Sequence, residues 1–275
     1  MELLFSEEEF IMLSLLLGAD KIVGIEDNES LLKKSAAELQ DIWVKVKVGL
    51  QEKRYIGNEQ DQTLEVDAAV YHLLSICHHP ELLFTAQMTE HKAESLHTNY
   101  YFNADGIVSL TIHSPEGSRA QIALKHYEKV TDVTDHLEKT WNPYATNYAD
   151  TEEFVETALS KSKYFSFIAA LNMKNLVKAA ELLTTVGLNE EDAQDAASGF
   201  INKGRFVTFC CSRITDEVEV SKMIMFYFGV KACWIIEVPS GEDTALKLTK
   251  ASVEQCLQPM KQLIMTQYGS LATYS

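Results

Sequence analysis

The chain of 275 residues passes twice through the same order of hydrophobic periodicities. In each half, segments with helical spacing of apolar residues come first, and segments that alternate apolar and polar residues follow. Arg205 to Cys211 falls in the second half where Leu82 to Met88 falls in the first. Phe226 to Phe228 likewise matches Tyr100 to Phe102. The simplest explanation is a duplicated unit of helices followed by a strand meander.

Helix signals open both halves. Ser6 followed three residues later by Glu9 is a capping box and predicts a first helix directly after it. Apolar residues spaced by four and three from Leu31 to Leu50 predict a second helix, and Asp61 to Cys77 a third. Asp150 to Phe154 resembles the opening at Ser6 and predicts the first helix of the second half.

Alternating segments follow the third helix of the first half, because Pro80 bars its continuation. Asp105-Gly106 and Ser114 to Gly117 are turn signals between these segments. The segments therefore predict four strands in antiparallel order. The predicted strands are Leu82–Met88, Leu96–Phe102, Val108–Ile112 and Ile122–Leu124.

A single such unit would leave one sheet face and one edge uncovered, whereas two units can continue one sheet. We therefore predict an α+β fold in which two pseudo-twofold units share a central antiparallel sheet and carry a C-terminal amphipathic helix. The first unit takes residues 1–130, a connector takes residues 131–148, and the second unit takes residues 149–275. The last helix is expected from Thr249 to Tyr268 with a kink at Pro259, and the two units are expected to form one compact body.

Charge and hydropathy exclude several kinds of partner. The chain has 24 Lys and Arg against 40 Asp and Glu, a formal charge of −16, which opposes binding to nucleic acid and to anionic lipid. The longest strongly apolar stretches have about ten residues, half of what a membrane-spanning helix requires, so no membrane insertion is expected. No basic residue precedes Lys21, and the five cysteines suit a reducing compartment. We expect a cytoplasmic protein.

No catalytic signature is present in the sequence. Glycine-rich phosphate loops and a nucleophile elbow are missing, so no catalytic residue and no cofactor are expected. Cys77-His78-His79 offers metal-ligand types, but adjacent residues rarely face one ion, and no metal site is expected. Cys210-Cys211 lies in an apolar run typical of a buried strand. An enzyme of unrecognised type, with His78, His79 or a carboxylate between the two units, stays open as an alternative.

Apolar residues remain on two segments where a core role and a binding role are both open. The strand from Met223 to Phe228 is apolar on both faces, so it is either buried on both sides or free on one side for a partner. The C-terminal helix has an apolar stripe that poses the same choice. The candidate partner-binding residues are Met223, Met225, Tyr227, Leu257, Met260, Leu263 and Ile264.

The element order and several local motifs resemble the EspG family, the cytosolic chaperones of type VII (ESX) secretion systems, and uncharacterised relatives in such loci. The resemblance rests on Phe5 to Leu13, on Leu50 to Ile56 followed by Gly57, on Leu64 to Cys77, and on His79 to Phe84. It implies a quasi-twofold sheet flanked by helices, no catalytic activity, and binding of helical secretion substrates that keeps them soluble.

One departure from the family pattern limits what carries over. The family has a long substrate-gripping loop between sheet strands, whereas Asn103 to Gly106 is a tight turn here. Only the class of function is therefore carried over. We expect a chaperone or adaptor for helical secreted proteins. An immunity or antitoxin-like protein that binds a basic effector is the alternative, and pairing of the chain as a homodimer stays open.

Overall fold

The computed structural model describes residues 2–19, 22–25, 34–57, 64–90, 96–113, 120–145, 155–201, 205–215, 218–239, 245–251 and 253–272. The elements of the first half are β1 (Glu2–Ser6), α1 (Glu7–Leu16), α3 (Ala36–Glu52), α4 (Ala68–His78), β2 (Leu82–Glu90), β3 (Leu96–Asn103), β4 (Gly106–His113), β5 (Gln121–Tyr127) and α5 (Val130–Ala145). Those of the second half are β6 (Val155–Leu159), α6 (Lys161–Asn172), α7 (Leu176–Thr184), α8 (Glu190–Ile201), β7 (Arg205–Ile214), β8 (Val218–Phe228), β9 (Cys233–Pro239), β10 (Leu246–Ala251) and α9 (Val253–Ala272).

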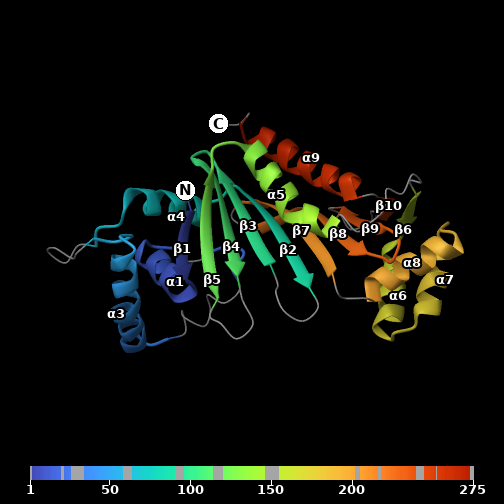
Figure 1. Cartoon of the computed structure of the whole chain (residues 1–275), viewed down its shortest axis with the longest axis horizontal. Coiled ribbons are helices and arrows are strands. Elements are labelled where there is room, and N and C mark those ends of the chain that lie inside the picture. The colour runs from blue at the N-terminus through green and yellow to red at the C-terminus, as the bar shows by residue number, and fades with distance from the viewer. Residues whose placement is uncertain are drawn as a thin grey trace.

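Both halves have the same element order within the described residues: a strand, three helices, four strands and a helix. All ten strands join one antiparallel sheet in the order β1-β5-β4-β3-β2-β7-β8-β9-β10-β6 (Figure 1). This order reads the same from either end when each strand is replaced by its counterpart. The two halves meet where β2 pairs with β7, with Ala86 opposite Phe209. The predicted α+β fold with a shared antiparallel sheet is confirmed.

Local signals explain where the helices of the first half begin. The Glu9 N–H donates to Ser6 Oγ over 3.1 Å, and the Ser6 N–H donates to the Glu9 carboxylate over 2.6 Å, so the predicted capping box is present. The third helix, α4, begins at Ala68 instead of Asp61. The Asp67 carboxylate caps α4, and Val66 before it pairs in a β-bridge with Ile56.

Two strands that the sequence patterns did not indicate form the outer edges of the sheet. β1 pairs with β5 at one edge, and β6 pairs with β10 at the other. The predicted helix opening at Asp150 to Phe154 lies outside the described residues, and the residues that follow it form β6. The first helix of the second half, α6, begins after Ser160, whose hydroxyl accepts from the Lys163 N–H. Ser160 is thus the structural counterpart of Ser6.

Most of the predicted connector is a helix. α5 covers residues through Ala145, and its Val133 and Leu137, four residues apart, are buried against the sheet. The C-terminal helix α9 begins at Val253 because the residues before it form β10, and it contains Pro259. The predicted turn from Ser114 to Gly117 lies outside the described residues.

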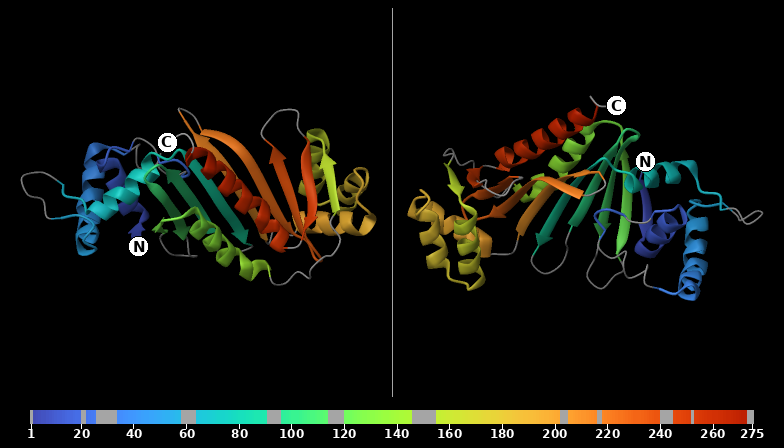
Figure 2. Two further views of the ribbon diagram at one scale, coloured as in Figure 1. Left: turned by 90° about the horizontal axis from the view of Figure 1, so that it is seen from above. Right: turned by 180° about the vertical axis from the view of Figure 1, so that it is seen from behind.

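The helices cover the two faces of the sheet differently. α5 and α9 lie side by side across the middle of one face, and the Lys261 ammonium on α9 contacts the Glu138 carboxylate on α5 over 2.6 Å (Figure 2). On the other face, α1, α3 and α4 cover one end of the sheet, and α6, α7 and α8 cover the opposite end. Alternation along β2 serves both faces, since Leu82 belongs to the core under α5 and α9 and Leu83 to the core under α1, α3 and α4. None of the described helices has the length and apolarity needed to cross a membrane.

Candidate functional site

The residues predicted on β8 pack on both faces of the sheet. Ile224 and Phe226 are buried under α5 and α9, whereas Met225 and Tyr227 are partly buried against α6, α7 and α8. The Tyr227 ring lies 3.7 Å, centroid to centroid, from that of Phe200 on α8, and burial raises the pKa of Tyr227. Met223 is half-buried. Of the two alternatives that the sequence left open, the strand follows the one in which both faces are packed.

The residues predicted on α9 lie in the core. Met260, Leu263 and Ile264 are 1, 9 and 1% exposed and pack against the sheet, which differs from the predicted partner surface. The side chain of Leu257 lies outside the description of α9. An amphipathic stripe looks the same in sequence whether the helix docks on its own sheet or on a foreign chain, and here its own sheet takes the stripe.

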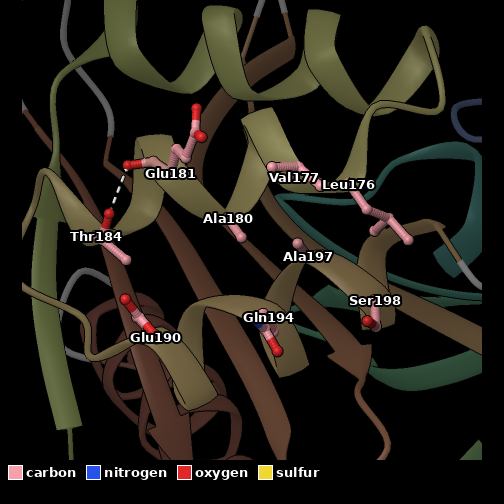
Figure 3. Close-up of a pocket in the computed structure, with 9 residues that line it drawn as sticks. All are labelled: Leu176, Val177, Ala180, Glu181, Thr184, Glu190, Gln194, Ala197 and Ser198. Atoms are coloured by element: carbon pink, nitrogen blue, oxygen red, sulfur yellow. Dashed lines mark hydrogen bonds between the residues drawn. The ribbon is translucent and has the colours of Figure 1, made fainter.

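An open groove lies between α7 and α8 at the end of the sheet. It has a volume of about 450 Å³. Leu176 and Ser198 lie together at one end, and Thr184 and Glu190 lie together at the other, so the two helices run antiparallel (Figure 3). The lining residues are Leu176, Val177, Ala180, Glu181 and Thr184 of α7 and Glu190, Gln194, Ala197 and Ser198 of α8.

Small side chains produce this groove. Ala180 and Ala197 face each other across its middle, so no bulky side chain fills the space between the helices there. Leu176 and Val177 at one end are 40 and 70% exposed. The turn between the helices contains Gly187 at φ +104°, a backbone conformation that glycine adopts without strain.

Large apolar side chains next to the groove are also exposed. Phe165 on α6 and Met173 at its C-terminal end are 66 and 81% exposed. Single exposed apolar residues are ordinary, but four of them along α6 and the start of α7, beside an open groove, indicate a surface that binds another protein. The candidate functional site is therefore the α7–α8 groove with Phe165 and Met173 beside it.

A buried carboxylate holds α8 on the sheet. Asp195 Oδ1 accepts from the backbone N–H groups of Val230 and Lys231, each over 2.8 Å. Its Oδ2 accepts from Trp234 Nε1 over 2.9 Å and from the Ala232 N–H over 3.2 Å. These four donors lie at the β8–β9 connection, so the groove wall is fixed to the sheet at one point.

Two further contacts of α8 support the same arrangement. The Lys250 ammonium on β10 contacts the Asp192 carboxylate over 2.6 Å, and both side chains are largely buried. A Cβ added to Gly199 would lie 2.8 Å from the backbone nitrogen of Gly229, so this close approach requires glycine. Sequence reasoning missed Asp195 and Gly199, because neither stands in a recognisable motif.

The reactive side chains noted in the sequence are in unreactive surroundings. Burial raises the pKa of the Cys77 thiol. Burial, and then the neighbouring His79, lower the pKa of His78 to about 4, so its ring is neutral near pH 7. Burial also raises the pKa of the thiols of Cys210 and Cys211, and both are free. Within the described ranges, no three His, Cys, Asp or Glu side chains are grouped to hold a metal.

A second cavity, of about 330 Å³, lies between β5 and α5. The His136 Nδ1 atom in its wall is 2.8 Å from the Tyr100 hydroxyl, and burial lowers the pKa of His136. Burial also raises the pKa of Tyr100. At neutral pH both rings are therefore uncharged, and the contact joins α5 to the sheet.

Comparison with known proteins identifies the fold. No family model matches this sequence, and no curated protein sequence matches it either. Among solved structures, the chain is similar to the type VII secretion system chaperone EspG5 of Mycobacterium tuberculosis, solved in complex with the PE25-PPE41 dimer, with a TM-score of 0.69, 10% identity and coverage of 96% of each chain. This chain has the EspG5 fold. At so low an identity, the likeness to EspG5 shows the shared fold alone.

Two other solved structures are far less similar. A putative adenylate cyclase from Bacillus halodurans is 9% identical over 70% of this chain and 75% of its own. A dehydratase domain of the curacin polyketide synthase is 8% identical over 67% of this chain and 80% of its own. Both have a TM-score of 0.15, which carries no argument about fold or activity.

Proposed function

We propose that this chain is a cytoplasmic chaperone or adaptor that holds a helical client of a type VII-like secretion system. The observation that carries the proposal is an open helical groove on a scaffold that matches the chaperone EspG5 over 96% of both chains. EspG5 is described in complex with a PE25-PPE41 dimer, which supports a protein client for the present chain. The resemblance noted in the sequence supports the same class of function.

The size of the groove fits a short helical contact. It extends over eight residues of α7, roughly 12 Å, which equals about two turns of a docked helix. Covering roughly 400 Å² of apolar surface contributes about 10 kcal/mol. Association costs roughly 4–15 kcal/mol, so the groove alone supplies modest affinity, and the client must also contact the neighbouring surface.

Several residues qualify for that neighbouring surface. Phe165 and Met173 are exposed beside the groove. Met223, Met225 and Tyr227 on β8 keep partly exposed side chains and remain proposed client contacts. Leu257 also stays a prediction. The buried residues of α9 are left out of the proposal because they are already covered.

The test is recovery of the client from the native cell with tagged wild-type protein and two matched variants. Val177→Asp places a charge in the groove, and Val44→Asp places one on α3, where the side chain is 59% exposed and far from the groove. We expect wild type and Val44→Asp to retain small helical secreted proteins and Val177→Asp to lose them about tenfold. Circular dichroism checks that both variants fold. Equal recovery by both variants would contradict a client site in the groove.

The alternative of an immunity protein is favoured by one observation, the formal charge of −16. In the same experiment, recovery of a large basic effector instead of small helical proteins would support it. The enzyme alternative gains no support from the two histidines predicted for it. His78 is half-buried at the end of α4, and its ring contacts that of His79.

A further inference from the structure

The α7–α8 groove has two chemically different ends. Its apolar end is formed by Leu176 and Val177, which are exposed to solvent. Its opposite end lies beside the turn between the helices and contains Glu190, with Glu181 one turn away on α7 (Figure 3). These two carboxylates are the only charged groups among the lining residues.

The two carboxylates are available to a partner. Among the described residues, no cation pairs with Glu181 or Glu190. The neighbouring lysines are engaged elsewhere: Lys231 pairs with Glu191, and Lys163 lies 3.4 Å from the Thr185 carbonyl oxygen. The acidic end therefore keeps a local negative charge on a chain that is already strongly acidic.

The groove is suited to side chains of a helix. Its walls are two helices whose backbone groups are bonded within the helices, so a partner strand finds no free backbone edge to pair with. The Thr184 hydroxyl donates to the Glu181 carbonyl oxygen over 2.8 Å, so this polar group is already satisfied. Ala180 and Ala197 leave room for a large apolar side chain between them.

We infer that the occupant is an amphipathic helix held in one polarity, with a large apolar residue over Ala180 and Ala197 and a lysine or arginine at the end formed by Glu181 and Glu190. This inference rests on the proposed function and adds the chemistry of the partner. The distance from Leu176 to Thr184 along α7, roughly 12 Å, sets the spacing. The basic residue follows the first apolar residue by seven or eight positions on the same face of the helix.

The test uses two synthetic helix-stabilised peptides of about 16 residues, with leucine at positions i and i+4. One carries lysine at i+8 and the other glutamate. Affinities are measured by fluorescence anisotropy in roughly 0.15 M salt, where the Debye length of about 8 Å screens distant charges. The groove variant is Glu181→Lys with Glu190→Lys. The matched control is Glu52→Lys with Glu219→Lys, two exposed positions away from the groove with the same change in net charge.

We expect wild type to prefer the lysine peptide by roughly fivefold and the groove variant to reverse that preference. The control variant should keep the wild-type order. An unchanged order in the groove variant, or an equal change in both variants, would overturn the inference. If Val177→Asp still abolishes binding in that case, the proposed function stands and only the assigned polarity fails. If Val177→Asp binds both peptides like wild type, the groove is not the site and both fail.

Discussion

The two helix groups on the same face of the sheet occupy equivalent places in the repeat but have different cores. The core under α1, α3 and α4 contains large side chains, among them Phe5, Phe10, Leu13 and Leu50. The core under α6, α7 and α8 is rich in alanine, with Ala170, Ala179, Ala193, Ala196 and Ala197 buried. Small residues let α7 and α8 approach closely and leave a groove on their outer side. One copy of the unit thus fills its space, while the other presents a surface.

The second unit depends on a single buried carboxylate, and removing it tests that dependence. Asp195→Ala leaves four donors without an acceptor, among them the buried Trp234 indole. We expect the free energy of unfolding to fall by roughly 3–5 kcal/mol, measured by urea denaturation. The control is Glu191→Ala on the same helix, an exposed residue whose loss should leave the unfolding midpoint nearly unchanged. Similar midpoints for the two variants would refute this role of Asp195.

Much of this fold could be predicted because its signals are local. The alternation from Leu82 onward and the capping box at Ser6 depend only on neighbouring residues, and both predictions are confirmed. The edge strands β1 and β6 were missed because five-residue strands that pair with distant β5 and β10 carry little periodicity of their own. The paired helix openings were also misaligned, since Ser160 and not Asp150 corresponds to Ser6.

The candidate site was harder to predict than the fold. The stripe that contains Met260 and Ile264 is strongly apolar, and that is why it lies in the core. The groove instead arises from alanines, which in a sequence resemble ordinary helix formers. Its existence depends on how close α7 and α8 lie, a tertiary property that periodicity does not report. Exposed Val177 and Met173 were visible in the sequence but were not distinguishable from core residues there.

Acid should separate the two halves, because all eight histidines lie in the first. Burial, and then His79, hold the pKa of His78 at about 4, below the usual 6.5, so the unfolded chain binds a proton more readily than the folded one. The stabilising effect is complete above pH 6.5 and is lost as the pH falls toward 4. With a discount for partial exposure, we expect a loss of about 1–2 kcal/mol. Burial lowers the pKa of His136 in the same direction.

Hydrogen exchange at pH 7 and pH 5 measures this difference between the halves. We expect amides of α4 and β3 to lose protection before those of α8 and β9, because His78 lies at the end of α4. His78→Gln should reduce the acid sensitivity of the first half and leave the second half unchanged. Earlier loss of protection in α8 would show that the histidines do not set the order.

Filling the groove should make the second unit resemble the first at little cost in stability. Ala180 is half-buried at the middle of the groove, so the added side chain of Ala180→Leu projects into open space and not into the core. We expect the free energy of unfolding to change by less than about 0.5 kcal/mol. Affinity for the lysine peptide should fall roughly tenfold, because the leucine occupies the place of the peptide's apolar side chain. Ala180→Ser, which keeps the groove open, is the control; if the leucine variant binds as well as the serine variant, the alanine floor is not what admits the client.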